Sequence, residues 1–313
     1  MSFSLNKNQD NSLNRNDTEG NATEKLNLWF YEEHDKAFKT GFQVNNVLFS
    51  QKSSYQRVDI LETSYFGKVM LIDGLMMVSE KDEFVYHEMI AHVPLLVHKS
   101  PKRVLIIGGG DGGTLREVLK HDSVEEVVMC EIDALVIDAS RKYLKSLSCC
   151  FDHPKATVIV GDGVEYVKNA PPQSFDIVIV DSTDPIGPGV GLFSKDFYKN
   201  IKRLLNEDGI VTAQCESPWY ENMDLSKVYS NLSFVFDKVF AYSAPVPTYP
   251  LGYWSWGFAS NTFHPYTSIN TEMAKKISEK ASYYNQDIHR ACFALPNFFK
   301  KKLKGRTENS KDV

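Results

Sequence analysis

Acidic residues follow four successive predicted strands of this chain, and such residues can bind a cation or accept a proton. Each strand is a short run of apolar, often β-branched residues, with a carboxylate at or just beyond its carboxyl end. In chain order, the carboxylates belong to Asp111, to Glu131 with Asp133, to Asp162, and to Asp181 with Asp184. Because ligands of open α/β sheets bind beyond the carboxyl ends of the strands, we expect these side chains to share one crevice.

The charge of this cluster indicates a positively charged ligand. Neighbouring carboxylates raise one another's pKa unless a cation lies among them. A single acid after a strand is usually a helix N-cap or a turn former. Acids after four successive strands are poorly explained in that way.

The glycine-rich turn narrows the class of ligand. Gly108, Gly110 and Gly113 satisfy the G-x-G-x-x-G spacing, and Glu131 follows at a distance typical of an acid that binds ribose. This pattern alone fits a nicotinamide-dependent dehydrogenase equally well. However, Asp111 lies inside the turn, where its carboxylate would repel a pyrophosphate. A nucleoside with a cationic tail and no phosphate, as in S-adenosylmethionine chemistry, fits the turn better.

Two regions of different sequence pattern position these residues. After Pro101, apolar runs alternate with helical segments, which predicts βαβ units and a buried parallel sheet. From Leu28 to Val78 the runs are short and alternating, with a hairpin signal at Asp73-Gly74, which predicts a small antiparallel domain. Residues 80–97 between them have a helical period, with an apolar face made of Phe84, Tyr86, Met89, Ile90 and Val93.

The expected fold class is therefore α/β, with a Rossmann-like parallel-sheet domain preceded by a small antiparallel β domain. We place a disordered tail at 1–25, the β domain at 26–80, the Rossmann-like domain at 81–300 and a basic, frayed C-terminus at 301–313. The tail is rich in Asn, Asp and Ser and has too few apolar residues to offset the entropy of ordering.

Composition excludes several classes of protein. The 313 residues are 42% hydrophobic and 24% charged, which suits a globular chain with a sizeable core. The net charge of −5 argues against a broad nucleic-acid surface. No apolar run approaches the ~20 residues of a membrane span, and no leader is evident. We expect a cytoplasmic protein without nucleic-acid or membrane partners.

The cysteine and histidine patterns predict neither disulfides nor a metal site. The five cysteines include no C-x-x-C spacing, which favours reduced thiols. His87 and His92 are five residues apart and diverge on a helix, so we expect no bound metal.

Five motifs together resemble those of the polyamine aminopropyltransferases, over nearly the whole chain from about Trp29 to Phe298. They are LIIGGGDGGTLREVLKH (105–121), CEID (130–133), GDG (161–163), DSTDPIGP (181–188) and PTYPLG (247–252). The resemblance implies a small β domain before a Rossmann-like domain of the class I S-adenosylmethionine-dependent methyltransferase type, in homodimers or homotetramers. It also implies transfer of the aminopropyl group of decarboxylated S-adenosylmethionine to a diamine, usually putrescine. The donor is a co-substrate that leaves as methylthioadenosine, and no cofactor is permanently bound.

The resemblance assigns a donor site. Glu131 would hold the ribose hydroxyls, and Asp162 with Gly163 would face the adenine. Asp111 would pair with the propylammonium and also adjoin the acceptor. Gln43 matches a donor-contact position in the N-terminal domain.

The resemblance also assigns an acceptor site. His87, Asp184 and Tyr249 would bind the amine, and Asp181 and Tyr86 would be catalytic. An alkylammonium with a pKa near 10.4 costs about 4.6 kcal/mol to deprotonate at pH 7. Either Asp181 accepts that proton, or the positive charge of the donor lowers the pKa of the amine and Asp181 only positions it.

Two further segments have more than one interpretation. Residues 185–193 (PIGPGVGLF) resemble the family's flexible gate, in which Pro188 matches a donor-contact position and Gly189 replaces the usual alanine. Trp254 and Trp256 alternate in a β-like run, which indicates either sheet packing or a lining of the acceptor channel.

Other activities stay open at this point. The acceptor could be agmatine, cadaverine or a triamine, and the enzyme could instead be a putrescine N-methyltransferase that uses intact S-adenosylmethionine. Asp111 disfavours the methyltransferase, because it would repel the carboxylate of the intact donor. A catalytically silent binder is disfavoured because Tyr86, Asp111, Asp181 and Asp184 are all present.

Overall fold

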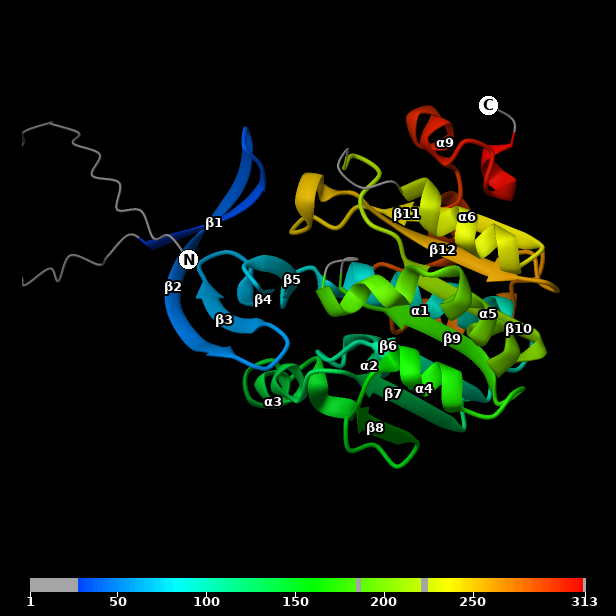
Figure 1. Ribbon diagram of the computed structural model, residues 1–313, viewed down its shortest axis with the longest axis horizontal. Helices are drawn as coiled ribbons and strands as arrows, with labels where there is room; N and C mark the ends of the chain where they lie inside the picture. Colours follow the sequence, from blue (N-terminus) through cyan, green and yellow to red (C-terminus); the bar gives the residue numbers. More distant parts are fainter. Residues whose placement is uncertain (1–27, 184–186, 221–224, 312–313) are drawn as a thin grey trace, which may run out of the picture.

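The chain forms an antiparallel sheet followed by a larger α/β domain (Figure 1). The computed structural model describes residues 28–183, 187–220 and 225–311. The predicted tail at 1–25 therefore lies outside the described residues. Within them, no helix is both long enough and apolar enough to cross a bilayer.

The N-terminal domain is a five-stranded antiparallel meander, as predicted. Its strands, paired in chain order, are β1 (Leu28–Asp35), β2 (Phe38–Lys52), β3 (Arg57–Thr63), β4 (Gly67–Ile72) and β5 (Leu75–Ser79). Asp73 and Gly74 both have positive φ, 49° and 87°, between β4 and β5. These values are those of a tight hairpin turn, and they confirm the predicted hairpin.

The C-terminal domain is built on a seven-stranded sheet in the order β11-β12-β10-β9-β6-β7-β8. Its strands are β6 (Arg103–Gly108), β7 (Glu126–Glu131), β8 (Ala156–Val160), β9 (Phe175–Asp181), β10 (Leu205–Gln214), β11 (Lys238–Ala244) and β12 (Trp254–Ser260). The chain runs outward from β6 on one side and then on the other, so a topological switch point lies between β6 and β9. The Rossmann-like fold class is confirmed.

One strand departs from the predicted parallel sheet. Strand β12 is antiparallel to both β10 and β11, so the sheet is mixed. The run from Trp254 to Trp256 that suggested a strand belongs to β12. Strand β12 follows β11 without an intervening α-helix. Two consecutive parallel strands need a crossover connection, usually a helix, whereas two antiparallel strands do not.

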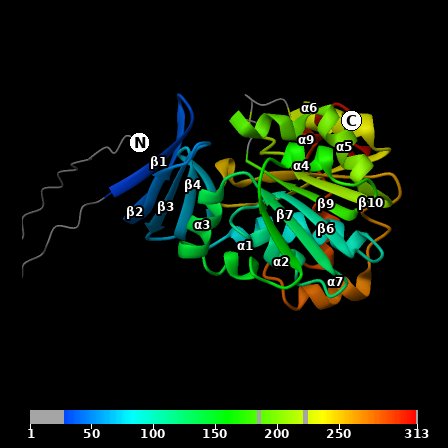
Figure 2. The ribbon, with the colours of Figure 1, turned by 60° about the horizontal axis from the view of Figure 1, so that its bottom comes forward.

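Helices cover both faces of this sheet (Figure 2). On one face lie α1 (Glu83–Val97), α2 (Gly113–Val118) and α7 (Thr271–Ser278), and on the other α4 (Gly163–Asn169), α5 (Lys195–Leu204), α6 (Leu225–Val235) and α9 (Asn297–Leu303). Successive residues of β6 alternate between the two cores: Ile106 packs in the first, and Leu105 and Ile107 pack in the second. This alternation is why the strands are apolar on both faces.

The remaining helices join parts of the molecule. Helix α3 (Ala134–Tyr143) packs on β3 and shares a core with Val58, Ile60 and Met70 of the N-terminal sheet. Helix α8 (Gln286–Ala291) follows α7. Short 3-10 turns are η1 (Ser148–Cys150), η2 (Gly187–Phe193), η3 (Pro250–Gly252) and η4 (Glu308–Ser310).

Two sequence expectations about helices and ends need correction. The helix expected at 80–97 begins at Glu83, and the carboxylate of the preceding Asp82 is bound by Ser79 and Thr248 rather than by the first turn of the helix. That helix is buried from Val85 to Val97 rather than on one face, since it lies between the sheet and α7. The end expected to fray at 301–313 is packed as far as it is described: Thr307 and Ser310 are buried, and Asn309 bonds the Ala241 backbone.

Candidate active site

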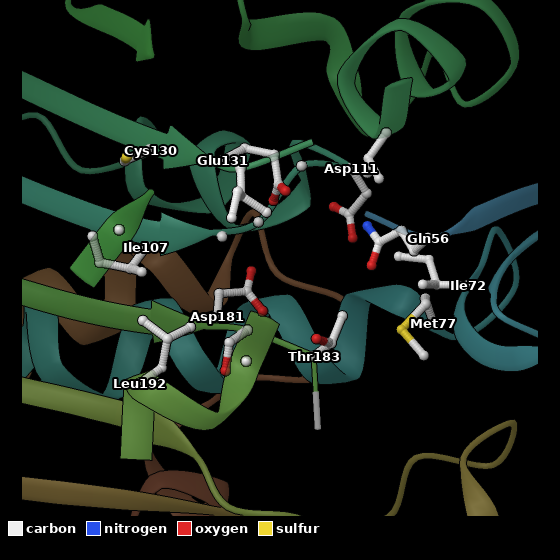
Figure 3. A pocket seen from close by; sticks show the side chains of 18 of the residues that line it. Gln56, Ile72, Met77, Ile107, Asp111, Cys130, Glu131, Asp181, Thr183 and Leu192 are labelled. Carbon is white, nitrogen blue, oxygen red and sulfur yellow. The ribbon is translucent and has the colours of Figure 1, made fainter. Parts of the chain in front are cut away.

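An open cavity, with about 920 Å³ of empty space including solvent at its mouth, lies at the carboxyl ends of β6, β7 and β9 (Figure 3). Four predicted carboxylates line it, namely Asp111, Glu131, Asp162 and Asp181. Strands β4 and β5 of the N-terminal domain close the opposite side with Met70, Ile72 and Met77. Asp184, another predicted acid of this site, lies outside the described residues.

Glycines let the ends of two strands approach each other at this cavity. Gly108 lies level with Asp181 in the register of β6 and β9, and it has φ of 83°. A Cβ at Gly108 would lie 2.1 Å from the backbone oxygen of Asp181. That oxygen accepts a hydrogen bond from the Gly109 amide at 2.9 Å. Only glycine fits, for both the close approach and the left-handed backbone.

The Asp181 carboxylate accepts one hydrogen bond on each oxygen. The Tyr86 hydroxyl donates to Oδ1 at 2.7 Å, and the Thr114 hydroxyl donates to Oδ2 at 2.7 Å. Burial and the charge of Asp111 raise the pKa of Asp181, although His87 and the two donors oppose them. Burial and Asp181 raise the pKa of Tyr86 well above its usual value, so Tyr86 remains a donor at neutral pH. Asp181 is therefore a base of increased strength.

Asp111 is fixed from behind by a chain of buried charges that runs from α1 to α2. His87 Nε2 lies 3.3 Å from Asp111 Oδ1, and His87 Nδ1 lies 2.6 Å from Glu83 Oε2. Arg116 then contacts Glu83 at 2.8 Å. Burial alone would lower the pKa of His87, but Asp111 and Glu83 outweigh it and raise the value well above normal. Burial alone would raise the pKa of Asp111, and the charge of His87 outweighs it.

This arrangement corrects the expected role of His87. The side chain is 2% exposed and does not line the cavity, so it holds Asp111 instead of facing a ligand. The Gly113 amide adds a second contact, at 2.6 Å to Asp111 Oδ1.

Glu131 and Asp162 lie at the ends of β7 and β8. The Asp133 amide donates to Glu131 Oε1 at 2.9 Å, and burial raises the pKa of Glu131 to about 7. Asp133 itself caps α3 and accepts from Ser53, which is a structural role. Asp162 caps α4 and still borders the cavity beside Gly163.

The N-terminal domain contributes a different glutamine from the one expected. Gln43 is exposed on β2, where the Ser64 hydroxyl donates to its side chain at 3.1 Å, and it does not line the cavity. Gln56 lines the cavity instead, just before β3, and lies beside Asp111 in Figure 3. Alternation within β2 points Gln43 away from the core, whereas a residue in a turn between strands has no periodic signal in the sequence.

A second cavity of about 440 Å³, here called the side pocket, adjoins the first. Met77, Tyr86, Ser182, Thr183 and Tyr249 line both. The Tyr249 hydroxyl donates to the Met77 carbonyl at 2.7 Å, which fixes its ring between the two cavities. Residues that line only the side pocket include Glu32, Leu75, Gln214, Tyr220, Pro250 and Trp254.

The two tryptophans of β12 have different roles. Trp254 lines the side pocket, while Trp256 is fully buried and packs 5.5 Å from the Tyr86 ring. Trp256 therefore fits the interpretation of this run as sheet packing, and Trp254 fits its interpretation as pocket lining.

The segment expected to be a gate lies next to the cavity where it is described. Gly189 and Leu192 of η2 line the cavity, and Pro188 belongs to the same turn. Sequence reasoning also missed Cys130, Thr183 and Leu192 as lining residues, because apolar and small polar residues at strand ends carry no distinctive signal. Within the described residues, no three His, Cys, Asp or Glu side chains are arranged to hold a metal ion.

The fold and the cavity define a Rossmann-like protein whose cavity, at the carboxyl ends of the strands, is lined with acids. Comparison with known families then identifies the lineage. The spermine/spermidine synthase domain matches residues 83–299, and the spermidine synthase tetramerisation domain matches residues 28–80. The chain belongs to the spermine/spermidine synthase family.

Relatives with assigned names are similar over most of their length. Polyamine aminopropyltransferase of Thermotoga neapolitana is 46% identical over 286 residues, covering 89% of this chain and 95% of the relative. That of Clostridioides difficile is 45% identical over 280 residues, covering 89% and 99%. A crystal structure of spermidine synthase in complex with the transition state analogue AdoDATO matches with a TM-score of 0.86 and 45% identity, covering 93% of this chain and 98% of that one.

Proposed function

We propose that the protein is an aminopropyltransferase that converts putrescine and decarboxylated S-adenosylmethionine into spermidine and methylthioadenosine. The observation that carries this proposal is the convergence of four carboxylates on one cavity, which adjoins a side pocket of mixed polar and apolar lining. The donor contributes a sulfonium and an ammonium, and these charges complement buried acids. The names of the relatives support the same reaction.

The donor would lie in the main cavity. Glu131 accepts hydrogen bonds from the ribose hydroxyls, and Asp162 with Gly163 faces the adenine. Asp111 pairs with the propylammonium, with its charge maintained by His87. Gln56 replaces Gln43 in the proposed donor site, because it lies beside Asp111. Pro188 remains a proposed donor contact.

The transfer is a displacement at carbon. The nitrogen lone pair of the neutral amine forms the new C–N bond as the C–S bond breaks, and the bonding electrons remain on sulfur as the neutral thioether. The nitrogen must lose one proton, and Asp181 is positioned to accept it, with its pKa raised by burial and Asp111. Tyr86 orients the carboxylate. Alignment of the nitrogen, carbon and sulfur atoms within the cavity then supplies most of the catalysis.

The acceptor would extend from Asp181 into the side pocket. Met77, Tyr249 and Trp254 offer surface for its methylene chain. The distal ammonium needs an anion, because burying an unpaired charge is costly. Glu32, 3% exposed, supplies a carboxylate there. Asp184 remains a proposed acceptor contact outside the described residues.

Turnover assays test this proposal. The purified protein is incubated with decarboxylated donor and putrescine, cadaverine, agmatine or spermidine, and methylthioadenosine and the polyamine product are measured. We expect methylthioadenosine to be released faster with putrescine than with the other amines. A parallel assay with intact S-adenosylmethionine would yield N-methylputrescine if the enzyme were a methyltransferase, and that result would contradict the proposal.

We also propose that the protein is a homodimer or homotetramer, which the match of its first 53 described residues to a tetramerisation domain supports. Light scattering at several concentrations measures the assembly, and a monomer at all of them would contradict it.

A further inference from the structure

A hydrogen bond between the two domains crosses one wall of the side pocket. Tyr220 belongs to the connection after β10, and His34 lies on β1 of the N-terminal sheet. The Tyr220 hydroxyl lies 3.1 Å from His34 Nδ1. His34 Nε2 in turn lies 2.8 Å from the Thr40 hydroxyl on β2.

The ionisation of His34 suits this bridge. Burial lowers the pKa of His34, so the ring is neutral at neutral pH. A neutral imidazole has one acceptor and one donor nitrogen. Nδ1 can therefore accept from the Tyr220 hydroxyl while Nε2 donates to Thr40.

The backbone of Tyr220 is held as well. Lys302 Nζ on α9 donates to the Tyr220 carbonyl at 2.8 Å. The neighbouring Trp219 stacks on Phe298 of the same helix, with ring centroids 4.2 Å apart. Hydrogen bonds therefore hold both the hydroxyl and the carbonyl of this tyrosine, which lines the side pocket.

The position of this bridge along the side pocket follows from the shared lining. The five residues common to both cavities mark the end nearest Asp181, and Tyr220 and Glu32 line only the side pocket. Glu32 Oε1 lies 3.6 Å from His34 Nδ1, so the bridge stands beside this buried carboxylate, outside the lining that the two cavities share.

We propose that Tyr220, anchored by His34, is the end wall of the acceptor pocket and determines which amine length the enzyme accepts. This inference rests on the proposed function and deepens it. A short diamine ends at Glu32. A triamine carries additional methylenes and one more ammonium past that carboxylate, where it must displace the tyrosine and bury a charge that the wall does not pair.

Substitutions at Tyr220 test this role through a ratio of activities. Tyr220→Ala removes the wall, Tyr220→Phe removes only the bridge to His34, and Tyr65→Ala replaces an exposed tyrosine of the N-terminal domain as a control. For each protein, kcat/KM is measured with spermidine and with putrescine at saturating decarboxylated donor. We expect the spermidine-to-putrescine ratio to rise about tenfold in Tyr220→Ala and less in Tyr220→Phe, with the donor KM and the control unchanged.

The ratio distinguishes failure of this inference from failure of the proposed function. If the unsubstituted protein releases methylthioadenosine with putrescine but Tyr220→Ala leaves the ratio unchanged, the wall has no part in selection. If Tyr220→Ala loses all turnover, the spermidine-to-putrescine ratio is read from Tyr220→Phe instead. An unchanged ratio in that variant likewise means that the wall has no part in selection. An unsubstituted protein that already uses spermidine as well as putrescine also overturns the inference. If the unsubstituted protein turns over no amine, the proposed function itself is wrong.

Discussion

At the scale of single residues, the site depends on carboxylates whose neighbours differ. Asp111 has a cationic partner behind it, and its pKa is lowered. Asp181 accepts from the hydroxyls of Tyr86 and Thr114, and its pKa is raised by burial and by Asp111. Two acids with oppositely shifted pKa values have separate duties in one cavity: one is a permanent anion and the other can take a proton.

Replacement of Asp181 tests the proton-accepting role. Asp181→Asn keeps the size of the side chain and a carbonyl oxygen for one donor, but it removes the base. We expect kcat to fall on the order of 10²–10⁴-fold, with a smaller change in the donor KM. Steady-state kinetics with putrescine measure this, and Asp196→Asn, an exposed change, is the control. Near-normal kcat in Asp181→Asn would show that the amine loses its proton elsewhere.

At the scale of elements, α1 and α2 position Asp111 through Glu83, His87 and Arg116. Glu83→Gln removes one of the two anions that keep His87 charged. We expect the donor KM to rise about tenfold, as loss of a charge-assisted hydrogen bond costs about 1–3 kcal/mol.

The pH profile distinguishes this positioning role from general damage to the fold. His87 should lose its proton at lower pH in Glu83→Gln, so the donor KM should increase with pH at values where that of the unsubstituted protein is flat. Glu165→Gln, on the exposed surface of α4, serves as the matched change. If the pH dependence of kcat changed in Glu83→Gln while the donor KM did not, the positioning role of Glu83 would be contradicted.

The junction of β6 and β9 is a second element-scale feature. Gly108 and Gly74 both have positive φ. Of these two, only Gly108 has an atom so close that an added Cβ would clash with it. We expect Gly74→Ala to cost about 1 kcal/mol, from backbone strain alone. Gly108→Ala should cost several times more and also impair activity, because the end of β9 carries Asp181. Thermal unfolding and turnover measure both, and equal effects of the two changes would contradict this reasoning.

At the scale of the whole molecule, buried acids make stability depend on pH. The pKa of Glu131 is about 7 in the folded protein, against about 4.5 in the unfolded chain. A raised pKa means that the folded state favours the protonated acid. The stabilisation is therefore complete below pH 4.5 and is lost as the pH rises to about 7.

Comparison with Glu131→Gln isolates this effect from other titrating groups. From pH 5 to 7.5, we expect the free energy of unfolding to fall by about 2 kcal/mol more in the unsubstituted protein than in the variant. Urea denaturation at each pH measures the difference. Identical pH dependence in the two proteins would show that Glu131 is not desolvated as the fold indicates.

Much of the architecture could be predicted, because the spacing of apolar residues and the order of strands and helices can be read from the sequence. Alternating apolar runs indicated the N-terminal meander, Asp73-Gly74 indicated its hairpin, and acids after successive strands indicated their convergence. Parallel strands connected by helices must bring their carboxyl ends to one edge, so Asp111, Glu131, Asp162 and Asp181 were found from spacing alone.

Only the tertiary structure decided what each side chain faces. His87 lies behind Asp111, Gln56 rather than Gln43 reaches the cavity, and His34 and Tyr220 meet from different domains. These relations depend on how the small sheet packs against α3 and the larger domain, over sequence separations of up to 186 residues. The sequence determined which chemistry was available, because residue type and strand-end position are local properties. Packing determined which groups perform it, because burial and distance arise only when remote segments meet.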